Sequence, residues 1–215
     1  MPRVASLTAL VLALWAGPAA AATLDDLKPC YVSAGQAEEE RERILIRGTD
    51  FAQMSSVEVL FDGVVMAGVP TGSIGEFELQ LPAPFQRKGA RELVVTVRDA
   101  VNQVHKTTRV TNLAMTVKPN RASPRRRVRF RGRGFTRGAP VFAHYLFGGQ
   151  EQRRVRFARV STAPCGTFSV RRRLIPVENA RRGRWIMQVD QKREYSPEPD
   201  PVWVRRPIDV TQVFP

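Results

Sequence analysis

The chain has 215 residues, of which 43% are hydrophobic and 25% charged, a composition that is ordinary for a globular protein of one or two domains. Its 34 Lys and Arg residues outnumber its 20 Asp and Glu residues and give a net charge of +14, which favours anionic partners but does not indicate a fold. Two Cys and two His residues are too few for cysteine-rich zinc sites, iron–sulfur clusters or multi-histidine metal centres, so we expect no metal and no cofactor.

The first residues have the three parts of a secretory signal. Arg3 supplies a positive charge, residues 7–16 form an apolar run of ten, and four alanines at residues 19–22 provide a cleavage site. A run of this length is too short to span a membrane, which requires about 20 apolar residues. The sequence therefore predicts a signal peptide at residues 1–22. We expect the mature protein to be exported and soluble, either secreted, periplasmic or associated with the cell envelope, and not membrane-spanning.

The remainder of the chain contains an internal repeat. Residues 44–51 match residues 128–135 at an offset of 84, and residues 93–97 match residues 185–189 at an offset of 92. A single loop insertion in the second copy explains the change of offset. We therefore expect two domains, at residues 28–113 and 114–215, joined without a flexible linker.

Each copy alternates apolar and polar residues in short runs that are separated by Gly, Pro, Asn or Ser clusters. In the first copy this pattern predicts strands near residues 30–34, 43–48, 56–61, 64–69, 76–81, 92–98 and 103–112. Helical periodicity is absent. Seven short strands in about 90 residues are typical of an immunoglobulin-like sandwich, so the predicted fold is all-β, with two tandem immunoglobulin-like β-sandwiches after a cleaved signal peptide.

A turn motif after the second strand of each copy suggests a particular family. Residues 131–138 read Arg-Gly-Arg-Gly-Phe-Thr-Arg-Gly, and this segment resembles the G-x-G-F-x-x-G turn of the tandem IPT/TIG-type repeats in bacterial secreted proteins. The first copy departs from the motif, because Asp50 and Met54 stand where the second copy has Gly134 and Gly138. The resemblance covers nearly all of the mature chain and implies spacer, adhesive or carbohydrate-associated modules, with no common catalytic residues.

No catalytic motif accompanies this fold. The sequence contains no G-x-S-x-G elbow, H-E-x-x-H motif, phosphate-binding loop or calcium loop. His105 falls in the last strand of the first copy, and His144 falls between Ala143 and Tyr145, which we expect to point inward. We therefore expect both histidines to face solvent or to pack at a sheet edge, and we expect the protein not to be an enzyme.

The positive charge belongs to one half of the chain. Residues 23–113 hold 10 Lys and Arg against 13 Asp and Glu, whereas residues 114–215 hold 23 against 7. Alternation points many of the basic side chains of the second copy away from its core. If the second, fourth and fifth strands are neighbours in an A-B-E-D sheet, one face carries seven arginines. The candidate anion-binding residues are Arg127, Arg129, Arg131, Arg154, Arg156, Arg171 and Arg173.

Two functions from different classes fit this pattern. The first is a non-catalytic module whose arginine face docks on an anionic cell-envelope polymer, such as a wall phosphate or carboxylate polymer, because arginine binds both groups in a bidentate manner. The alternative is a structural spacer or assembly protein that self-associates, with the acidic segment at residues 38–42 of one molecule against the arginines of another. A protein partner remains open, whereas nucleic acid is disfavoured because few aromatics are interleaved with the arginines.

Cys30 and Cys165 form a candidate disulfide, because they are each other's only partners within an exported chain. We place Cys30 at the start of the first strand, at the outer end of the first domain, and Cys165 near the junction between the domains. A strand spans about 20 Å, whereas disulfide-bonded Cα atoms lie about 5.5 Å apart. Either the thiols are free in a straight rod, or a bridge forms and the second domain folds back along the first.

Overall fold

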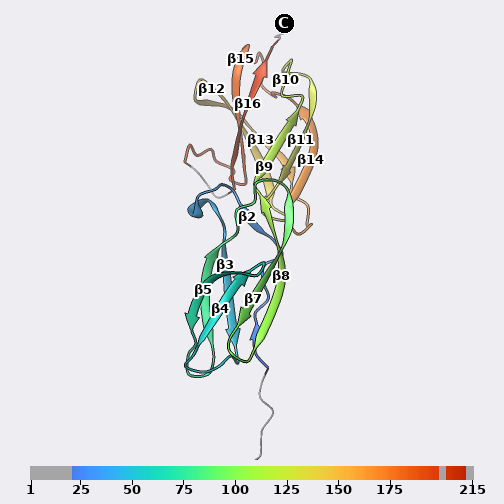
Figure 1. The fold of residues 1–215 in the computed structure, drawn as a ribbon. Coiled ribbons are helices and arrows are strands. Elements are labelled where there is room, and N and C mark those ends of the chain that lie inside the picture. Colours follow the sequence, from blue (N-terminus) through green and yellow to red (C-terminus); the bar gives the residue numbers. More distant parts are fainter. Residues whose placement is uncertain (1–20, 199–201, 212–215) are drawn as a thin grey trace, which may run out of the picture.

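The computed structural model describes residues 21–198 and 202–211, and within these residues the chain forms two β-sandwiches stacked end to end (Figure 1). The signal peptide predicted at residues 1–22 lies almost wholly outside the described residues. No helix in the described segments has the length and apolar character needed to cross a membrane.

Each sandwich contains eight strands. The first is built from β1 (Thr23–Leu24), β2 (Tyr31–Ser33), β3 (Arg43–Thr49), β4 (Ser56–Phe61), β5 (Val64–Pro70), β6 (Phe77–Pro82), β7 (Ala90–Arg98) and β8 (Gln103–Asn112), with a 3-10 turn, η1 (Glu38–Glu40), between β2 and β3. The second is built from β9 (Ala114–Lys118), β10 (Arg121–Ala122), β11 (Arg127–Arg133), β12 (Pro140–Phe147), β13 (Gln150–Arg159), β14 (Thr167–Arg173), β15 (Gly183–Asp190) and β16 (Val204–Val210).

The two sandwiches have the same strand order. A three-stranded sheet, β1-β3-β6 or β14-β11-β9, packs against a five-stranded sheet, β2-β8-β7-β4-β5 or β10-β16-β15-β12-β13. The first strand of each copy is divided between the two sheets. A proline lies at each division, Pro29 before β2 and Pro119 after β9, and proline cannot donate a ladder hydrogen bond. This arrangement confirms the expected pair of immunoglobulin-like sandwiches.

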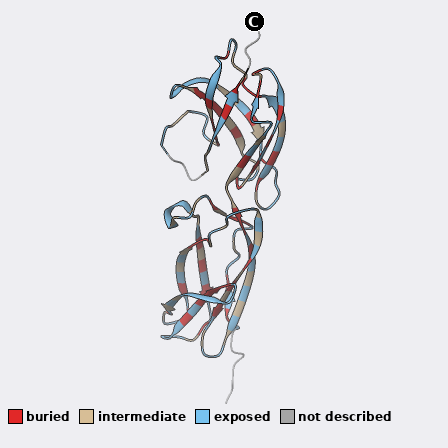
Figure 2. Cartoon of the chain, turned by 45° about the horizontal axis from the view of Figure 1, so that its top comes forward, coloured by how far each residue is buried: buried red, intermediate tan, exposed pale blue. Residues whose placement is uncertain are grey.

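Alternation along the strands places one apolar core inside each sandwich (Figure 2). The Gly-x-x-Phe turns close one end of each core. In the second domain a Cβ atom on Gly132 would lie 2.2 Å from the Phe168 ring, which in turn packs edge to face against Phe135 at 5.1 Å between centroids. Gly48, Phe77 and Phe51 repeat this arrangement in the first domain. Glycine is therefore required where the strand passes over the aromatic ring.

A disulfide joins the two domains. Cys30 and Cys165 are bonded, with their Cα atoms 5.2 Å apart, and the domains nevertheless extend end to end (Figure 1). The expectation that a bridge requires the second domain to fold back is therefore wrong. The first strand starts at Thr23 rather than at Cys30, so the chain has already run along most of the first domain when it reaches Cys30. Because β2 runs parallel to β8, Cys30 lies near the end of β8 that leads into the second domain.

Backbone hydrogen bonds within each domain hold the segments that meet at this junction. The amide of Leu113 donates to the Ser33 carbonyl at 3.3 Å, and the amide of Gly134 donates to the Cys165 carbonyl at 3.2 Å. Gly134 has φ +79, and a Cβ atom there would lie 2.9 Å from the Asn112 carbonyl oxygen. The second glycine of the turn motif thus allows the base of the second domain to approach the first domain closely.

We expect the purified, non-reduced protein to be a monomer whose intact mass is lower by two hydrogen atoms than after reduction. The double variant Cys30→Ser, Cys165→Ser should unfold at a lower urea concentration. The bridge spans 135 residues of sequence, and a crosslink over such a loop stabilises a folded chain by about 2–4 kcal/mol. Two free thiols on the monomeric protein would contradict the bridge.

Candidate functional site

Basic side chains gather on the three-stranded sheet of the second domain. On β11 the apolar side chains of Val128 and Phe130 are buried, whereas Arg129 and Arg131 are exposed. Arg129 lies opposite Lys118 of β9 on one side and opposite Arg171 of β14 on the other. Three cations therefore stand in one row across the sheet.

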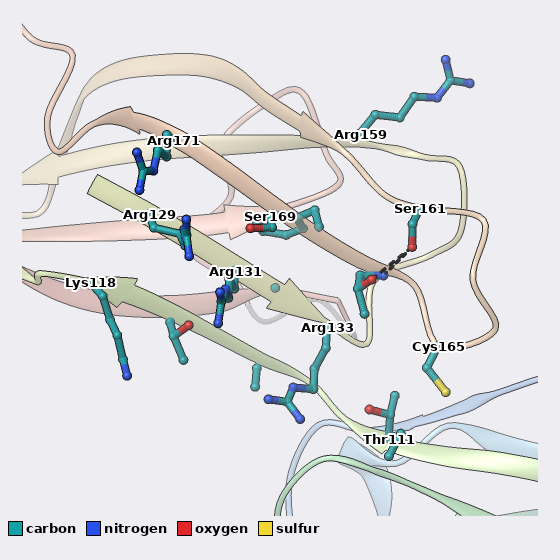
Figure 3. A pocket seen from close by; sticks show the side chains of 16 residues that line it. Thr111, Lys118, Arg129, Arg131, Arg133, Arg159, Ser161, Cys165, Ser169 and Arg171 are labelled. Atoms are coloured by element: carbon teal, nitrogen blue, oxygen red, sulfur yellow. Dashed lines mark hydrogen bonds between the residues drawn. The ribbon is translucent and has the colours of Figure 1, made fainter. Parts of the chain in front are cut away.

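This row is part of a groove of about 1010 Å³ that continues down to the junction (Figure 3). Ala90 and Thr111 of the first domain form its lower end. The basic residues that line it are Lys118, Arg129, Arg131, Arg133, Arg159 and Arg171, which together we call the cationic groove. No acidic residue lines the groove, and among the described residues no carboxylate forms an ion pair with these six side chains.

The first domain provides a direct comparison, because β3 and β6 pair in the same register as β11 and β14. Arg47 of β3 lies opposite Glu78 and forms an ion pair with it at 2.7 Å. At the corresponding positions of the second domain, Arg131 lies opposite Ser169. Leu45 of the first domain corresponds in turn to Arg129. The same sheet surface is thus neutralised in one domain and left cationic in the other.

The structure brings together five of the seven predicted arginines. Arg129, Arg131 and Arg171 line the cationic groove, and Arg127 and Arg173 lie opposite each other at the far end of the same strand pair. Sequence reasoning missed Lys118, Arg133 and Arg159. The alternation in residues 114–118 does predict an outward Lys118. Met115 is buried, and Lys118 follows it by three residues, which places Lys118 on the opposite face of the strand.

The expectation that Arg154 and Arg156 share this face is wrong. Both residues lie on β13, which pairs with β12 at the edge of the five-stranded sheet and not with β14. The physical reason is the two-residue turn at Gly148 and Gly149, whose φ values of +58 and +81 keep β13 in a hairpin with β12. Arg154 also forms an ion pair with Glu194 at 2.6 Å.

The expectation that His144 faces solvent or packs at a sheet edge is also wrong, because His144 is fully buried. His105 is exposed, as expected. The connection between β15 and β16 covers the outer face of the sheet at His144, with the Tyr195 ring 5.8 Å from the imidazole. Nδ1 of His144 lies 2.7 Å from the Glu151 carboxylate, and Nε2 lies 3.3 Å from Asp190. Burial disfavours a charged imidazole, but the hydrogen bonds to Asp190 and Glu151 outweigh it and raise the pKa of His144.

Further polar contacts hold the same connection against the sheet. Gln188 donates to the Asp190 carboxylate and to the Ser196 carbonyl, each at 2.9 Å, and accepts a hydrogen bond from Arg205 at 2.9 Å. Arg205 lies over the Trp203 ring, 4.6 Å from its centroid. Both nitrogens of His144 lie within hydrogen-bond distance of groups in this network, and the ring is fully buried. The cluster therefore links β12, β13 and β15 to the segment that follows β15.

Comparison with known proteins gives no functional assignment. No family model matches the chain, and no curated protein matches it. Among solved structures, it is similar to the titin Ig tandem domains A164–A165, at 11% identity and a TM-score of 0.29 over 88% of this chain and 95% of that one. It is also similar to fibronectin(III)-like modules of Clostridium thermocellum CbhA, at 13% identity and a TM-score of 0.28 over 89% of this chain and 94% of that one. The strand order alone carries the assignment of the fold.

The His144 cluster predicts a pH-dependent stability. Because the folded-state pKa of His144 is raised above the ordinary value of 6.5, its stabilisation is fully present below about pH 6.5 and is lost as the pH rises through the folded-state pKa. Urea unfolding of the wild type should show a decline over this interval that His144→Gln lacks. The exposed His105→Gln variant is the control and should keep the decline. Identical pH profiles for wild type and His144→Gln would refute the assignment.

Proposed function

We propose that the protein is an exported, non-catalytic binding module whose cationic groove docks on an anionic cell-envelope polymer. One observation carries this proposal: Lys118, Arg129 and Arg171 lie directly opposite one another across three strands, with no described carboxylate paired to any of them. Like charges in opposed positions destabilise a sheet unless an anion lies between them. At the positions that match Arg129 and Arg171, the first domain has Leu45 opposite Gln80, and two residues further along the strand it pairs Arg47 with Glu78, so it avoids this cost.

The spacing of the charges suits an extended polyanion. Arg129, Arg131 and Arg133 follow one another along β11 at every second residue, which places them about 7 Å apart. A polymer with an anionic group at each short repeat could contact successive guanidinium groups, which bind phosphate and carboxylate through two parallel hydrogen bonds. The groove is open at the surface, so a chain could lie along it without an end having to enter.

The alternative, self-assembly through the acidic segment at residues 38–42, is less well supported. Three of its carboxylates already have partners within the first domain. Glu38 pairs with Arg41, Glu40 accepts a hydrogen bond from the Ala37 amide, and Glu42 pairs with Lys28. Binding to the arginines of another molecule would require these contacts to be exchanged.

We expect the quadruple variant Arg129→Ala, Arg131→Ala, Arg133→Ala, Arg171→Ala, which changes only residues of the cationic groove, to bind polyphosphate and polygalacturonate at least tenfold more weakly than wild type. Each lost charge-assisted contact contributes about 1 kcal/mol or more. Titrations of wild type at increasing NaCl should show affinity falling steeply, because bound counterions are released, and the variant should show a shallower slope. Its thermal stability should be unchanged or slightly higher, because repulsion between opposed arginines is relieved.

The matched control removes four exposed arginines of the same domain that lie outside the groove, namely Arg125, Arg153, Arg182 and Arg184. This control changes the net charge equally and should retain most of the affinity. Equal losses in both variants would show that only net charge matters. Sedimentation of the purified protein alone should reveal a monomer at low and high salt, and salt-sensitive growth would favour the assembly alternative.

A further inference from the structure

A second, smaller cavity lies beside β14, away from the cationic groove. It occupies about 300 Å³ and is lined by residues of both sheets. Four arginines line it, Arg127, Arg156, Arg172 and Arg173, and no acidic residue does. Three of these arginines were predicted as parts of a flat arginine face. All four arginines are exposed at the cavity, and Nε of Arg172 donates to the Phe157 carbonyl of β13 at 3.5 Å.

A buried tyrosine contributes to the same cavity. Tyr145 is fully buried, and its hydroxyl has no hydrogen-bond partner among the described residues. Burying an unpaired hydroxyl is unfavourable, so an orphaned group of this kind indicates a missing partner. Burial raises the pKa of Tyr145, against the influence of the Arg172 charge, so the hydroxyl is a neutral hydrogen-bond donor at neutral pH. The cavity is therefore lined by four arginines and by a tyrosine whose buried hydroxyl lacks a partner among the described residues.

The first domain lacks this set. The register of the strand pairs gives each position its counterpart. The counterparts are Arg43 for Arg127, Phe61 for Tyr145, Gly68 for Arg156, Leu81 for Arg172 and Pro82 for Arg173. Phe61 and Leu81 belong to the apolar core of the first domain. The fold is thus stable with an apolar pair at the positions of Tyr145 and Arg172, and the polar groups are not needed to build the sandwich.

We propose that this cavity binds a single tetrahedral oxyanion, a phosphate or sulfate group, with the Tyr145 hydroxyl and the four arginines as donors. A tetrahedral oxyanion has acceptor oxygens in several directions, which suits a cavity lined by donor-bearing residues of four strands, β11, β12, β13 and β14. Val155, Phe157 and Pro176 supply apolar wall surface beside the donors, which suits the carbon skeleton of an organic monoester. The proposal does not depend on polymer binding in the cationic groove, since the two sites take ligands of different size.

To test the proposal, the full mature protein is titrated with inorganic phosphate, phenyl phosphate and sulfate at constant ionic strength. Binding is measured by calorimetry and by the shift of the melting temperature. We expect saturable binding at millimolar phosphate, with one site per chain, and tighter binding of phenyl phosphate. A stronger response to sulfate than to phosphate would identify the sulfate ester as the natural group. The absence of saturable binding to all three anions would overturn the proposal.

Tyr145→Phe separates this site from general electrostatics because it leaves the net charge unchanged. Loss of one hydrogen bond to a charged group should weaken phosphate binding about tenfold. Without phosphate the variant should be at least as stable as wild type, because the orphaned hydroxyl is gone. The matched control is Tyr31→Phe, whose hydroxyl accepts a hydrogen bond from the Lys28 amide at 3.1 Å. That variant should lose stability but keep its phosphate affinity.

A second pair of variants guards against misfolding of Tyr145→Phe. Arg172→Gln should weaken phosphate binding at least tenfold, whereas Arg184→Gln, which removes an equal charge from outside the cavity, should leave it nearly unchanged. Equal affinities for wild type, Tyr145→Phe and Arg172→Gln would overturn the proposal even if phosphate binds elsewhere. Polymer binding by Tyr145→Phe should remain intact, so failure of one site does not imply failure of the other.

Discussion

The bond between Cys30 and Cys165 is the constraint on which the arrangement of the two domains depends. It fixes the end of the first sandwich against the loop between β13 and β14 of the second. Cys165 itself lines the cationic groove, and Ala90 and Thr111 of the first domain complete the lower end. The groove therefore exists as a continuous surface only while the domains keep this relative position. A linker that allowed rotation would leave each half of the groove as a separate, shallower surface.

The two sandwiches show how one fold can be kept while its surface chemistry changes. The Gly-x-x-Phe turns, the divided first strand and the strand order are the same in both domains. The differences lie at positions that the fold leaves free. Arg47 faces Glu78 in the first domain, whereas Arg131 faces Ser169 in the second. These substitutions convert a neutralised sheet face into a cationic one without altering a single strand pairing.

Local patterns in the sequence predict the strands well, because alternation depends only on neighbouring residues. The predicted strands of the first domain agree with the structure to within two residues, apart from β1. The failures concern contacts between distant segments. The burial of His144 depends on the connection between β15 and β16, and the meeting of the cysteines depends on a strand that starts at Thr23. The placement of β13 was available locally, because Gly148-Gly149 is a hairpin signal.

The charge arrangement of the second domain is unfavourable for stability taken alone. Opposed arginines repel each other, and the hydroxyl of Tyr145 is buried without a described partner, although the first domain shows that the same fold accommodates apolar or paired residues at these positions. Proteins generally depart from locally favourable choices where binding requires it. Both departures here leave donors without acceptors, and both occur in the domain that carries the excess of positive charge. A ligand that supplies acceptor oxygens and negative charge would satisfy both, and this shared requirement is the physical basis of our proposal that the second domain binds anions.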